Sequence, residues 1–461
     1  MSRRRKTEAH AETRRRGVNK GGHSCPPNGE LGNSPAGENF VQTELGRLPA
    51  DWSALPIRDV GEVITGRTPS TKREDFYNGE YNLISPADLD NGKYVVTAHK
   101  RLSEVGFKEY RALPKDSVLV GCIGNVGKLG MISDERSATN QQINAVICDK
   151  NHDSHFIYYC LNENRARLEW AADKTTLPIL NKTNFENFEI ATPPLPEQRK
   201  IAAVLGMVQR ALEQQERLIA LTTELKKVLL HQLFTQGLRG EPQKQTEIGP
   251  VPQSWEVVAL GELVEEAPQV NMRTEAERNI QYIDVSSISR EFLRIETTSS
   301  FVLKDAPGRA RKKVKTGDVI FATVRPTLLR VARVAEDYDE QVCSTAFCVL
   351  RDKNRNTHGR YIYYLVQRER FIKQLAAIES GVSYPAVTDR QVKEQLVPVP
   401  DEGEQIEIAR TLEACDAKIS MHQRKRVALT ALFRTLLHQL MTAQIRVHDL
   451  DLPGLETFTG G

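Results

Sequence analysis

Two long stretches of the chain repeat hydrophobic residues at alternating steps of three and four, a pattern that predicts amphipathic coiled-coil helices. The first, about residues 197–235, carries Ile201, Val204, Val208, Ala211, Leu218, Leu225 and Leu229 in its stripe. The second carries Ile408, Leu412, Cys415, Ile419, Leu429, Leu432, Leu436 and Leu440. The polar residues Gln215, Thr222, Lys418, His422 and Lys425 interrupt the stripes, so neither is a pure zipper. A lone amphipathic helix of this length is marginal in water. We therefore expect the two helices to bury their stripes against each other, most simply antiparallel.

Shorter apolar runs bounded by turn residues precede each long helix, and they predict β-strands. Those before the first helix are residues 60–70, which run into a turn, and residues 81–89, 116–124 and 144–149. Residues 156–172 have a helical pattern. Pro193, Pro194 and Pro196 then end this globule, because proline is poor inside a helix and favourable just before one. The pattern indicates an α+β globule followed by a long helix.

The chain contains this plan twice. TELGRLPADW at residues 43–52 returns as TEIGPVPQSW at 246–255, with an offset of 203. LPEQRKIAAVL, ending at Leu205, returns as EGEQIEIARTL, ending at Leu412, and LLHQLFT returns as LLHQLMT, both with an offset of 207. The middle of each copy matches weakly and its offset drifts to about 201. We infer that the helical end of each copy keeps its length because its geometry matters, and that the middle varies because its side chains carry recognition. The alternative is a plain tandem duplication whose surfaces have diverged without a function.

These patterns predict an α+β chain of two tandem α/β domains, separated by two long antiparallel coiled-coil helices and related by a pseudo-twofold internal repeat. The expected boundaries are a disordered basic tail over 1–42, the first domain over 43–193, the central helix over 194–240, the second domain over 241–400, the distal helix over 401–445 and a C-terminal tail over 446–461.

Composition narrows the class of protein. The net charge of the 461-residue chain is only +3, and much of the excess lies in the first 40 residues. Any DNA-binding surface must therefore be a local patch. The seven cysteines form no CxxC pair, which disfavours a disulfide framework or a zinc site and suits small core residues in a reducing cytoplasm. No apolar stretch is long enough to span a membrane, and the basic N-terminus lacks the apolar segment of a secretory signal.

Motifs of catalysis are missing from the sequence. GCIGNVGK at residues 121–128 superficially resembles a phosphate loop, but Cys122 replaces the first glycine and Leu129 replaces the magnesium-binding Ser or Thr. A glycine-rich turn that lets the backbone approach DNA, or a plain turn, explains the segment better. There is no HExxH, no GxSxG and no Asn/Asp-Pro-Pro-aromatic tetrapeptide of an adenine methyltransferase. His231 and His438 occupy equivalent helix positions, and we expect partly buried structural histidines rather than metal ligands.

The two copies resemble the specificity (S) subunit of type I restriction–modification enzymes over about residues 43–445. The resemblance rests on TGRTPS (65–70), ISPADL (84–89), LPKDSVLVGCIGNVGKLG (113–130), TNQQINAV (139–146) and PPLPEQRKIAAVL (193–205). The second copy departs from the pattern, because VPVPDEGEQIEIA (397–409) lacks the double proline and ATVRPTLLRVA (322–332) replaces the GNVGK loop. The two domains therefore need not touch DNA through the same loops.

The resemblance implies a sequence-specific DNA-binding subunit without catalysis of its own, working in the cytoplasm in defence against foreign DNA. It implies that each globular domain is a target-recognition domain that reads one half of a bipartite site. The paired helices would set the spacer and dock two methylation subunits, and a restriction/translocase subunit would join to cut. The partner subunits would use S-adenosylmethionine, ATP and Mg, and this chain would bind no cofactor.

Reading bases requires bidentate donors such as Arg, Asn and Gln, whereas phosphates are bound by Lys, Arg, Ser and Thr. The candidates in the first domain are Arg67, Thr68, Ser70, Thr71, Lys72 and Arg73 in one polar turn, Asn125 and Lys128 in the glycine-rich turn, and the amide cluster Asn140, Gln141 and Gln142. Those in the second domain are Arg309, Arg311, Lys312, Lys313 and Lys315 as a phosphate track, with Arg325, Ser344, Thr345 and Tyr384. For each group the alternative is a solvated loop or strand edge.

Two other classes of function compete with this one. An enzyme with unrecognised motifs would need a cofactor pocket, which no sequence feature supports. A non-catalytic two-helix scaffold would bind protein partners through its globules instead of DNA. Charge reversal at Lys312 and Lys313 would separate the scaffold from the DNA-binding protein.

Overall fold

The computed structural model describes residues 39–173, 177–353, 358–381 and 384–450. The chain divides into two compact units, which we call unit 1 (residues 1–207 and 433–461) and unit 2 (residues 208–432). Most of the predicted disordered tail lies outside the described residues, but its last residues belong to strand β1 (Phe40–Thr43). The C-terminal segment is described as far as residue 450 and forms a short 3-10 turn, Val447–Asp449.

Unit 1 is built on two main sheets. The larger has the order β4-β11-β8-β9-β6, and the smaller has the order β10-β5-β7. Their strands are β4 (Gly61–Thr65), β5 (Tyr77–Ile84), β6 (Tyr94–Val95), β7 (Lys100–Leu102), β8 (Val118–Gly121), β9 (Leu129–Ile132), β10 (Ser137–Thr139) and β11 (Ile143–Cys148). The pairs β10·β5 and β6·β9 are parallel, and the remaining pairs are antiparallel. The strands predicted from the apolar runs thus all lie in these sheets.

Unit 2 repeats the arrangement with its own strands. One sheet has the order β16-β23-β20-β21 and the other β18-β17-β22-β19. The strands are β16 (Val264–Glu265), β17 (Asn279–Ile283), β18 (Ser299–Val302), β19 (Ala310–Lys313), β20 (Val319–Ala322), β21 (Val331–Arg333), β22 (Val342–Ser344) and β23 (Phe347–Asp352). The parallel pair β17·β22 corresponds to β5·β10 in unit 1. Both units also contain a short hairpin, β1·β2 (Gly46–Pro49) and β13 (Gln243–Thr246)·β14 (Gly249–Pro252), before the first sheet.

Each sheet pair is followed by helices and a short closing strand. In unit 1 these are α3 (Ser154–Glu163), α4 (Arg165–Ala171), α5 (Lys182–Glu186) and β12 (Glu189–Thr192), which pairs with β3 (Ser53–Pro56). In unit 2 they are α8 (His358–Leu365), α9 (Glu369–Ile378), α10 (Asp389–Lys393) and β24 (Leu396–Val399), which pairs with β15 (Glu256–Ala259).

One predicted helix is broken in the structure. The sequence pattern over residues 156–172 predicts a single helix, whereas α3 ends at Glu163 and α4 begins at Arg165. The Asn164 side chain donates to the carbonyl of Cys160 at 2.8 Å, and Asn164 itself has φ −92° and ψ 16°. Asn side chains compete for backbone partners in this way, which ends a helix that hydrophobic periodicity alone would continue.

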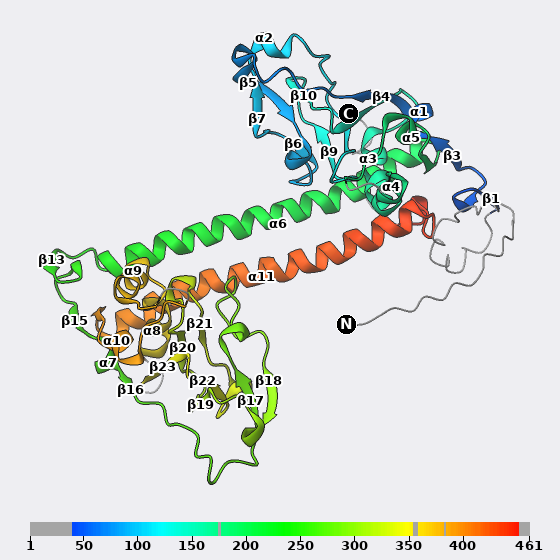
Figure 1. Cartoon of the computed structure of the whole chain (residues 1–461). Helices are drawn as coiled ribbons and strands as arrows, with labels where there is room; N and C mark the ends of the chain where they lie inside the picture. Colours follow the sequence, from blue (N-terminus) through cyan, green and yellow to red (C-terminus); the bar gives the residue numbers. More distant parts are fainter. Residues whose placement is uncertain (1–38, 174–176, 354–357, 382–383, 451–461) are drawn as a thin grey trace, which may run out of the picture. The chain divides into compact units, whose positions relative to one another are not determined.

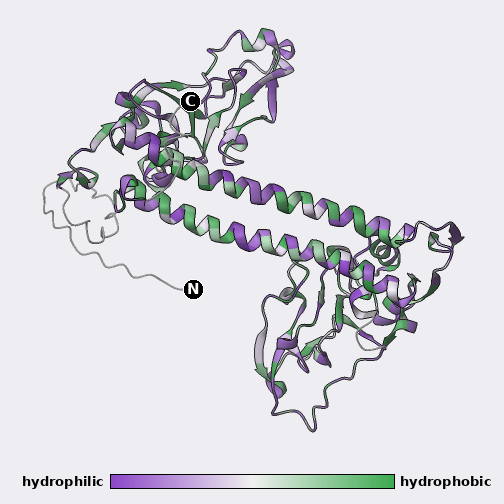
Figure 2. Ribbon diagram, turned by 180° about the vertical axis from the view of Figure 1, so that it is seen from behind, coloured by the Kyte–Doolittle hydropathy of each residue, from purple (hydrophilic) through white to green (hydrophobic). Residues whose placement is uncertain are grey.

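The two long helices are α6 (Leu195–Gln236) and α11 (Glu402–Met441), and they pack together as predicted. The expectation that the whole stripe is buried was wrong at Leu225 and Leu432, which are exposed. In unit 1 the beginning of α6 shares a core with the end of α11, through Ile201, Leu205 and Leu440. In unit 2 the end of α6 shares a core with the beginning of α11, through Phe234 and Leu412. The helices are therefore antiparallel (Figure 1), and both helices mix hydrophobic and hydrophilic residues along their length (Figure 2).

A polar pair lies between the helices in unit 2. His422 Nδ1 and Gln215 Oε1 are 2.8 Å apart, and Gln215 is 3% exposed. The two residues are 207 positions apart, so they occupy equivalent positions of the two copies. Two of the polar residues that interrupt the hydrophobic stripes, Gln215 and His422, thus contact each other. Any other register of the two helices would bury the Gln215 amide without this hydrogen-bond partner. Among the described residues, no helix combines the length and apolar character needed to cross a membrane.

Candidate nucleic-acid interface

Backbone hydrogen bonds bring the three candidate patches of unit 1 to neighbouring loops. The Arg67 amide donates to the Thr139 carbonyl at 3.0 Å, which joins the polar turn 67–73 to the amide cluster. The Cys122 amide donates to the Gln142 carbonyl at 2.8 Å, which joins the cluster to the glycine-rich turn. Local sequence patterns could not predict that these patches meet, because the contacts link residues far apart in the chain.

The side chains of the polar turn and the amide cluster are also connected. Thr68 Oγ1 donates to Gln141 Oε1, and both residues are exposed. Asn140 Nδ2 donates to Gln142 Oε1 at 3.0 Å, and the Gln142 amide donates to Asn140 Oδ1 at the same distance. Gln141 is therefore the amide of the cluster that projects to the surface, while Asn140 and Gln142 hold each other.

The arginines of the polar turn are fixed by neighbours on their own domain. The Arg67 guanidinium lies over the Tyr110 ring at 5.2 Å from its centroid. Burial raises the pKa of Tyr110 to about 12, so the ring beneath Arg67 stays neutral. Arg73 donates to both carboxylate oxygens of Asp75, at 2.8 and 2.6 Å. Ser70, Thr71 and Lys72 are exposed between the two arginines.

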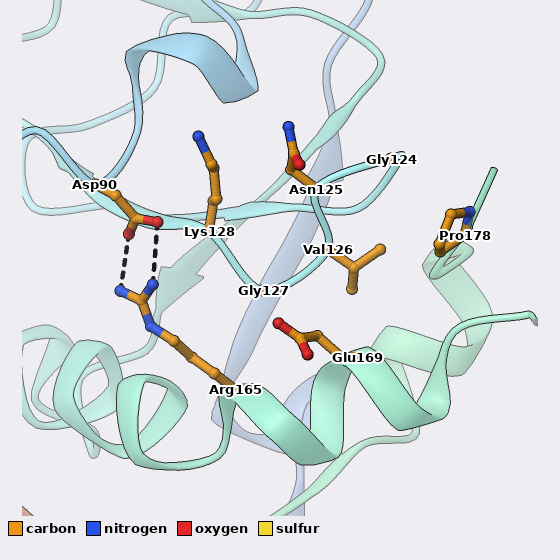
Figure 3. A pocket seen from close by; sticks show the side chains of 9 residues that line it. All are labelled: Asp90, Gly124, Asn125, Val126, Gly127, Lys128, Arg165, Glu169 and Pro178. Atoms are coloured by element: carbon orange, nitrogen blue, oxygen red, sulfur yellow. Dashed lines mark hydrogen bonds and ion pairs between the residues drawn. The ribbon is translucent and has the colours of Figure 1, made fainter. Parts of the chain in front are cut away.

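The glycine-rich turn borders a hollow of about 460 Å³. Asn125 and Lys128 extend to the same side of the turn, whereas Arg165 turns towards Asp90 and donates to both of its carboxylate oxygens, at 3.0 and 2.8 Å (Figure 3). The hollow mixes acidic and basic side chains, and no group of His, Cys, Asp or Glu suited to a metal ion was found among the described residues. The turn itself depends on positive φ at Gly124 (76°) and Gly127 (83°), which glycine adopts without strain.

Unit 2 has the same backbone frame with different side chains. The Thr323 amide donates to the Ala346 carbonyl at 2.8 Å, as Cys122 does to Gln142. The Arg325 amide donates to the Pro385 carbonyl at 2.7 Å, as Gly124 does to Pro178 at 2.9 Å. The Thr345 amide donates to the Arg309 carbonyl at 2.8 Å, which adds the loop before β19 to this edge. Arg309, Arg325, Thr345 and Tyr384 are all exposed there.

Most basic side chains of the run 309–315 contact groups of their own domain, unlike a row of lysines and arginines that is open to DNA phosphates. Lys312 is half-buried, donates to the Phe347 carbonyl at 2.6 Å and forms an ion pair with Asp389. Lys313 pairs with Glu275 at 2.8 Å, and Lys315 pairs with Glu340 at 3.4 Å. Arg311 is half-buried and donates to its neighbour's carbonyl. Ser344 is 2% exposed, and its hydroxyl accepts from the Ala346 amide at 3.2 Å.

A clamp of Trp, Glu and Arg, which the sequence patterns did not predict, joins each domain to both long helices. In unit 1, Arg446 donates to both oxygens of Glu197 at 2.9 Å and to Asp51 at 2.6 Å, and Trp52 Nε1 donates to Glu197 at 3.2 Å. The Glu belongs to the beginning of α6, the Arg follows the end of α11, and the Trp precedes β3.

Unit 2 has the equivalent clamp in a looser form. Trp255 Nε1 donates to Glu404 at 3.1 Å, and Arg239 lies 3.9 Å from the same carboxylate. Arg239 pairs mainly with Asp401, and the Glu404 carboxylate accepts instead from the Leu238 amide at 2.7 Å. Arg239 and Arg446 are 207 positions apart, so the helix offset of the repeat would have shown their equivalence.

The glutamine that follows each of these glutamates also has a structural role. Gln198 Nε2 donates to the Pro193 carbonyl at 2.8 Å, and Gln405 Nε2 donates to the Pro400 carbonyl at 2.9 Å. The Glu–Gln pair at the head of each helix thus holds the clamp and the preceding proline turn.

The two equivalent helix histidines are exposed, and most of the described cysteines are buried. His231 and His438 are exposed, contrary to the expected partial burial, and His438 Nδ1 contacts Glu163 at 2.8 Å. The histidine prediction was wrong because these positions lie on the outer side of the helices. Five of the six described cysteines are buried. Burial raises the pKa of Cys122 to about 11, so it remains a thiol beside the glycine-rich turn.

Comparison with known proteins identifies the repeated unit. The family described as the type I restriction modification DNA specificity domain matches residues 49–223 and again residues 252–431. The chain belongs to this family. It is a DNA-specificity subunit of a type I restriction–modification system, with two target-recognition domains in tandem, and such a subunit is non-catalytic. It forms part of a type I complex that binds DNA, whose partners are methyltransferase and endonuclease subunits.

The chain is similar to specificity subunits over nearly their whole length. The chain is 25% identical to the MjaVIII specificity subunit of Methanocaldococcus jannaschii over 426 residues, which cover 90% of this chain and 97% of the relative. It is 25% identical to the MjaIX specificity subunit of the same organism over 433 residues, covering 89% and 97%. The crystal structure of an S subunit from M. genitalium matches with a TM-score of 0.57 at 17% identity, over 85% of this chain and 96% of that one, and shares its fold.

Proposed function

We propose that each unit of this specificity subunit reads one block of a split DNA site. The observation that carries the proposal is the repeated backbone frame, which holds equivalent loops in both units but presents different side chains on them. A shared frame with different side chains is what two different base sequences require. Exposed members of the candidate set would make the contacts, among them Arg67, Thr68, Asn125 and Gln141 in unit 1, and Arg309, Arg325, Thr345 and Tyr384 in unit 2.

We further propose that the long helices set the gap between the blocks and dock the methylation subunits. Leu221, Leu225 and Val228 are 58%, 52% and 43% exposed, and their spacing places them on one face of α6. Exposed apolar side chains gathered on one helix face are typical of a protein contact. The docked subunits, rather than this chain, would carry S-adenosylmethionine, ATP and Mg, and the complex would work on DNA in the cytoplasm.

Two variants test these roles in one experiment, in which the chain is expressed with its methylation subunit and the methylated motifs are mapped. Gln141→Ala removes an exposed amide, so we expect one block of the motif to lose a defined position while the other block stays intact. Leu225→Glu puts a charge on the exposed face, so we expect loss of co-purification with the methylation subunit and of all methylation.

Thr223→Glu is the control for the second variant, because it adds the same charge on another face of α6 and should leave methylation unchanged. A Gln141→Ala chain that altered both blocks would contradict the assignment of one block to each unit. A Leu225→Glu chain that still assembled and methylated would contradict the docking face.

A further inference from the structure

Arg325 occupies a backbone conformation that few side chains adopt. Its φ is 50° and its ψ is 59°, in the left-handed region. The equivalent residue in unit 1, 201 positions earlier, is Gly124 with φ 76°. Both residues donate their amide to a proline carbonyl of the neighbouring loop. Because glycine makes this hydrogen bond in unit 1, the backbone does not require an arginine side chain at this position. A strained non-glycine residue at such a position points to a function for its side chain.

The partner loop supplies a platform for that side chain. The Arg325 guanidinium lies 4.7 Å from the centroid of the Tyr384 ring. Tyr384 is 69% exposed, although a large aromatic side chain gains stability by burial. Unit 1 carries Leu177 at the equivalent position, 207 residues earlier. Unit 2 therefore differs from unit 1 at both of these exposed positions, and the two differences contact each other.

A guanidinium held over an aromatic ring has lost part of its conformational freedom before it meets a ligand. The ring attracts the cation and restricts its rotamers, so less ordering remains to be done on binding. Arg presents a planar fork of donors that matches O6 and N7 of guanine in the major groove, and this is the commonest base-specific contact of proteins. The same fork also matches a phosphate, but only a contact to the base edge depends on the DNA sequence.

We propose that Arg325, positioned by Tyr384, reads a guanine in the block bound by unit 2. The inference rests on the proposed function and deepens it, because it assigns one base type to one residue. Unit 1 has no counterpart, since Gly124 offers no side chain at this position.

The test is Arg325→Gly in the complex with the methylation subunit, read out by mapping the methylated motif. Glycine suits the left-handed backbone, so we expect an unchanged or higher melting temperature. One G·C position of the unit 2 block should become degenerate, with a loss of about 5- to 150-fold in preference over the other bases. The unit 1 block should not change, and Thr327→Ala, at an exposed position of the same loop, should leave both blocks intact.

Two further variants separate base reading from charge. Arg325→Lys keeps the charge but loses the planar fork. Because Lys can also donate to guanine O6 and N7, this variant should keep part of the preference at that position, and Tyr384→Leu should weaken the same position. A uniform loss of methylation by Arg325→Gly, with no position of the motif becoming degenerate, would mean a phosphate contact and overturn the inference. A split motif that survives Arg325→Gly unchanged would overturn the inference alone. No motif with the unaltered chain would contradict the proposed function as well.

Discussion

At the scale of single residues, ion pairing divides the candidate DNA contacts into exposed side chains and neutralised ones. The turn at Arg67 and the amide at Gln141 are exposed, in keeping with their polar, glycine- and proline-bounded context. Lys312 and Lys313 looked equally available, yet acids at Asp389 and Glu275 neutralise them. Those acids lie 77 and 38 positions away in the chain, and only the folded sheet brings them close. Charge reversal at these lysines would disturb folding as well as any DNA contact.

Lys312→Ala should therefore lower stability. The variant leaves Asp389 and the Phe347 carbonyl without a charged donor, and a hydrogen bond to a charged group contributes about 1.5–3 kcal/mol. We expect a loss of this size in the free energy of opening of unit 2, measured by hydrogen exchange. Lys315→Ala is the matched control, because the Lys315 side chain is 55% exposed and its ion pair is screened by water. Equal stability of the two variants would show that Lys312 is solvated.

At the scale of elements, the long helices were predictable and their attachments were not. The hydrophobic stripe predicted about residues 197–235, and α6 spans Leu195–Gln236, because a long amphipathic period is a strong local signal. The break at Asn164 depends on one side-chain hydrogen bond and escaped the same reasoning. The clamps at Glu197 and Glu404 join three segments that are distant in sequence. The hydrogen bonds of the clamps could not be predicted from the sequence, because only the fold places those segments together.

The two clamps differ in burial, and this difference predicts different effects of the same substitution. Arg446 is 5% exposed and holds Glu197 through two hydrogen bonds of 2.9 Å. Arg446→Met leaves the largely buried Glu197 carboxylate without its charged partner, although the Trp52 indole still donates to it, so we expect a loss of about 3 kcal/mol in stability. Arg239→Met should change stability little, because the Arg239 side chain is 53% exposed and the Leu238 amide and Trp255 already bond Glu404.

Hydrogen exchange along the chain is the suitable measurement, since a chain with two units need not unfold in one step. Arg446→Met should lose protection in unit 1 while unit 2 keeps it. Loss of protection in both units, or in neither, would contradict the role given to Arg446.

At the scale of the whole molecule, the internal repeat was the strongest signal in the sequence. It predicted two copies of one α+β plan, and the family match at residues 49–223 and 252–431 confirms that the plan occurs twice. Sheet order and the parallel pairs β5·β10 and β17·β22 were beyond the sequence, because strand pairing is set by long-range contacts rather than local period. The candidate DNA contacts stay a prediction, and the structure adds which of them share a surface within each unit.

The most direct test of the account is to map methylated bases in the DNA of cells that express this chain together with its methylation subunit. The account predicts a split motif, in which two short defined blocks flank an undefined gap of fixed length. A single contiguous motif would contradict the reading of one block by each unit. A stable complex that methylates no defined motif would contradict the claim that the two units read DNA sequence.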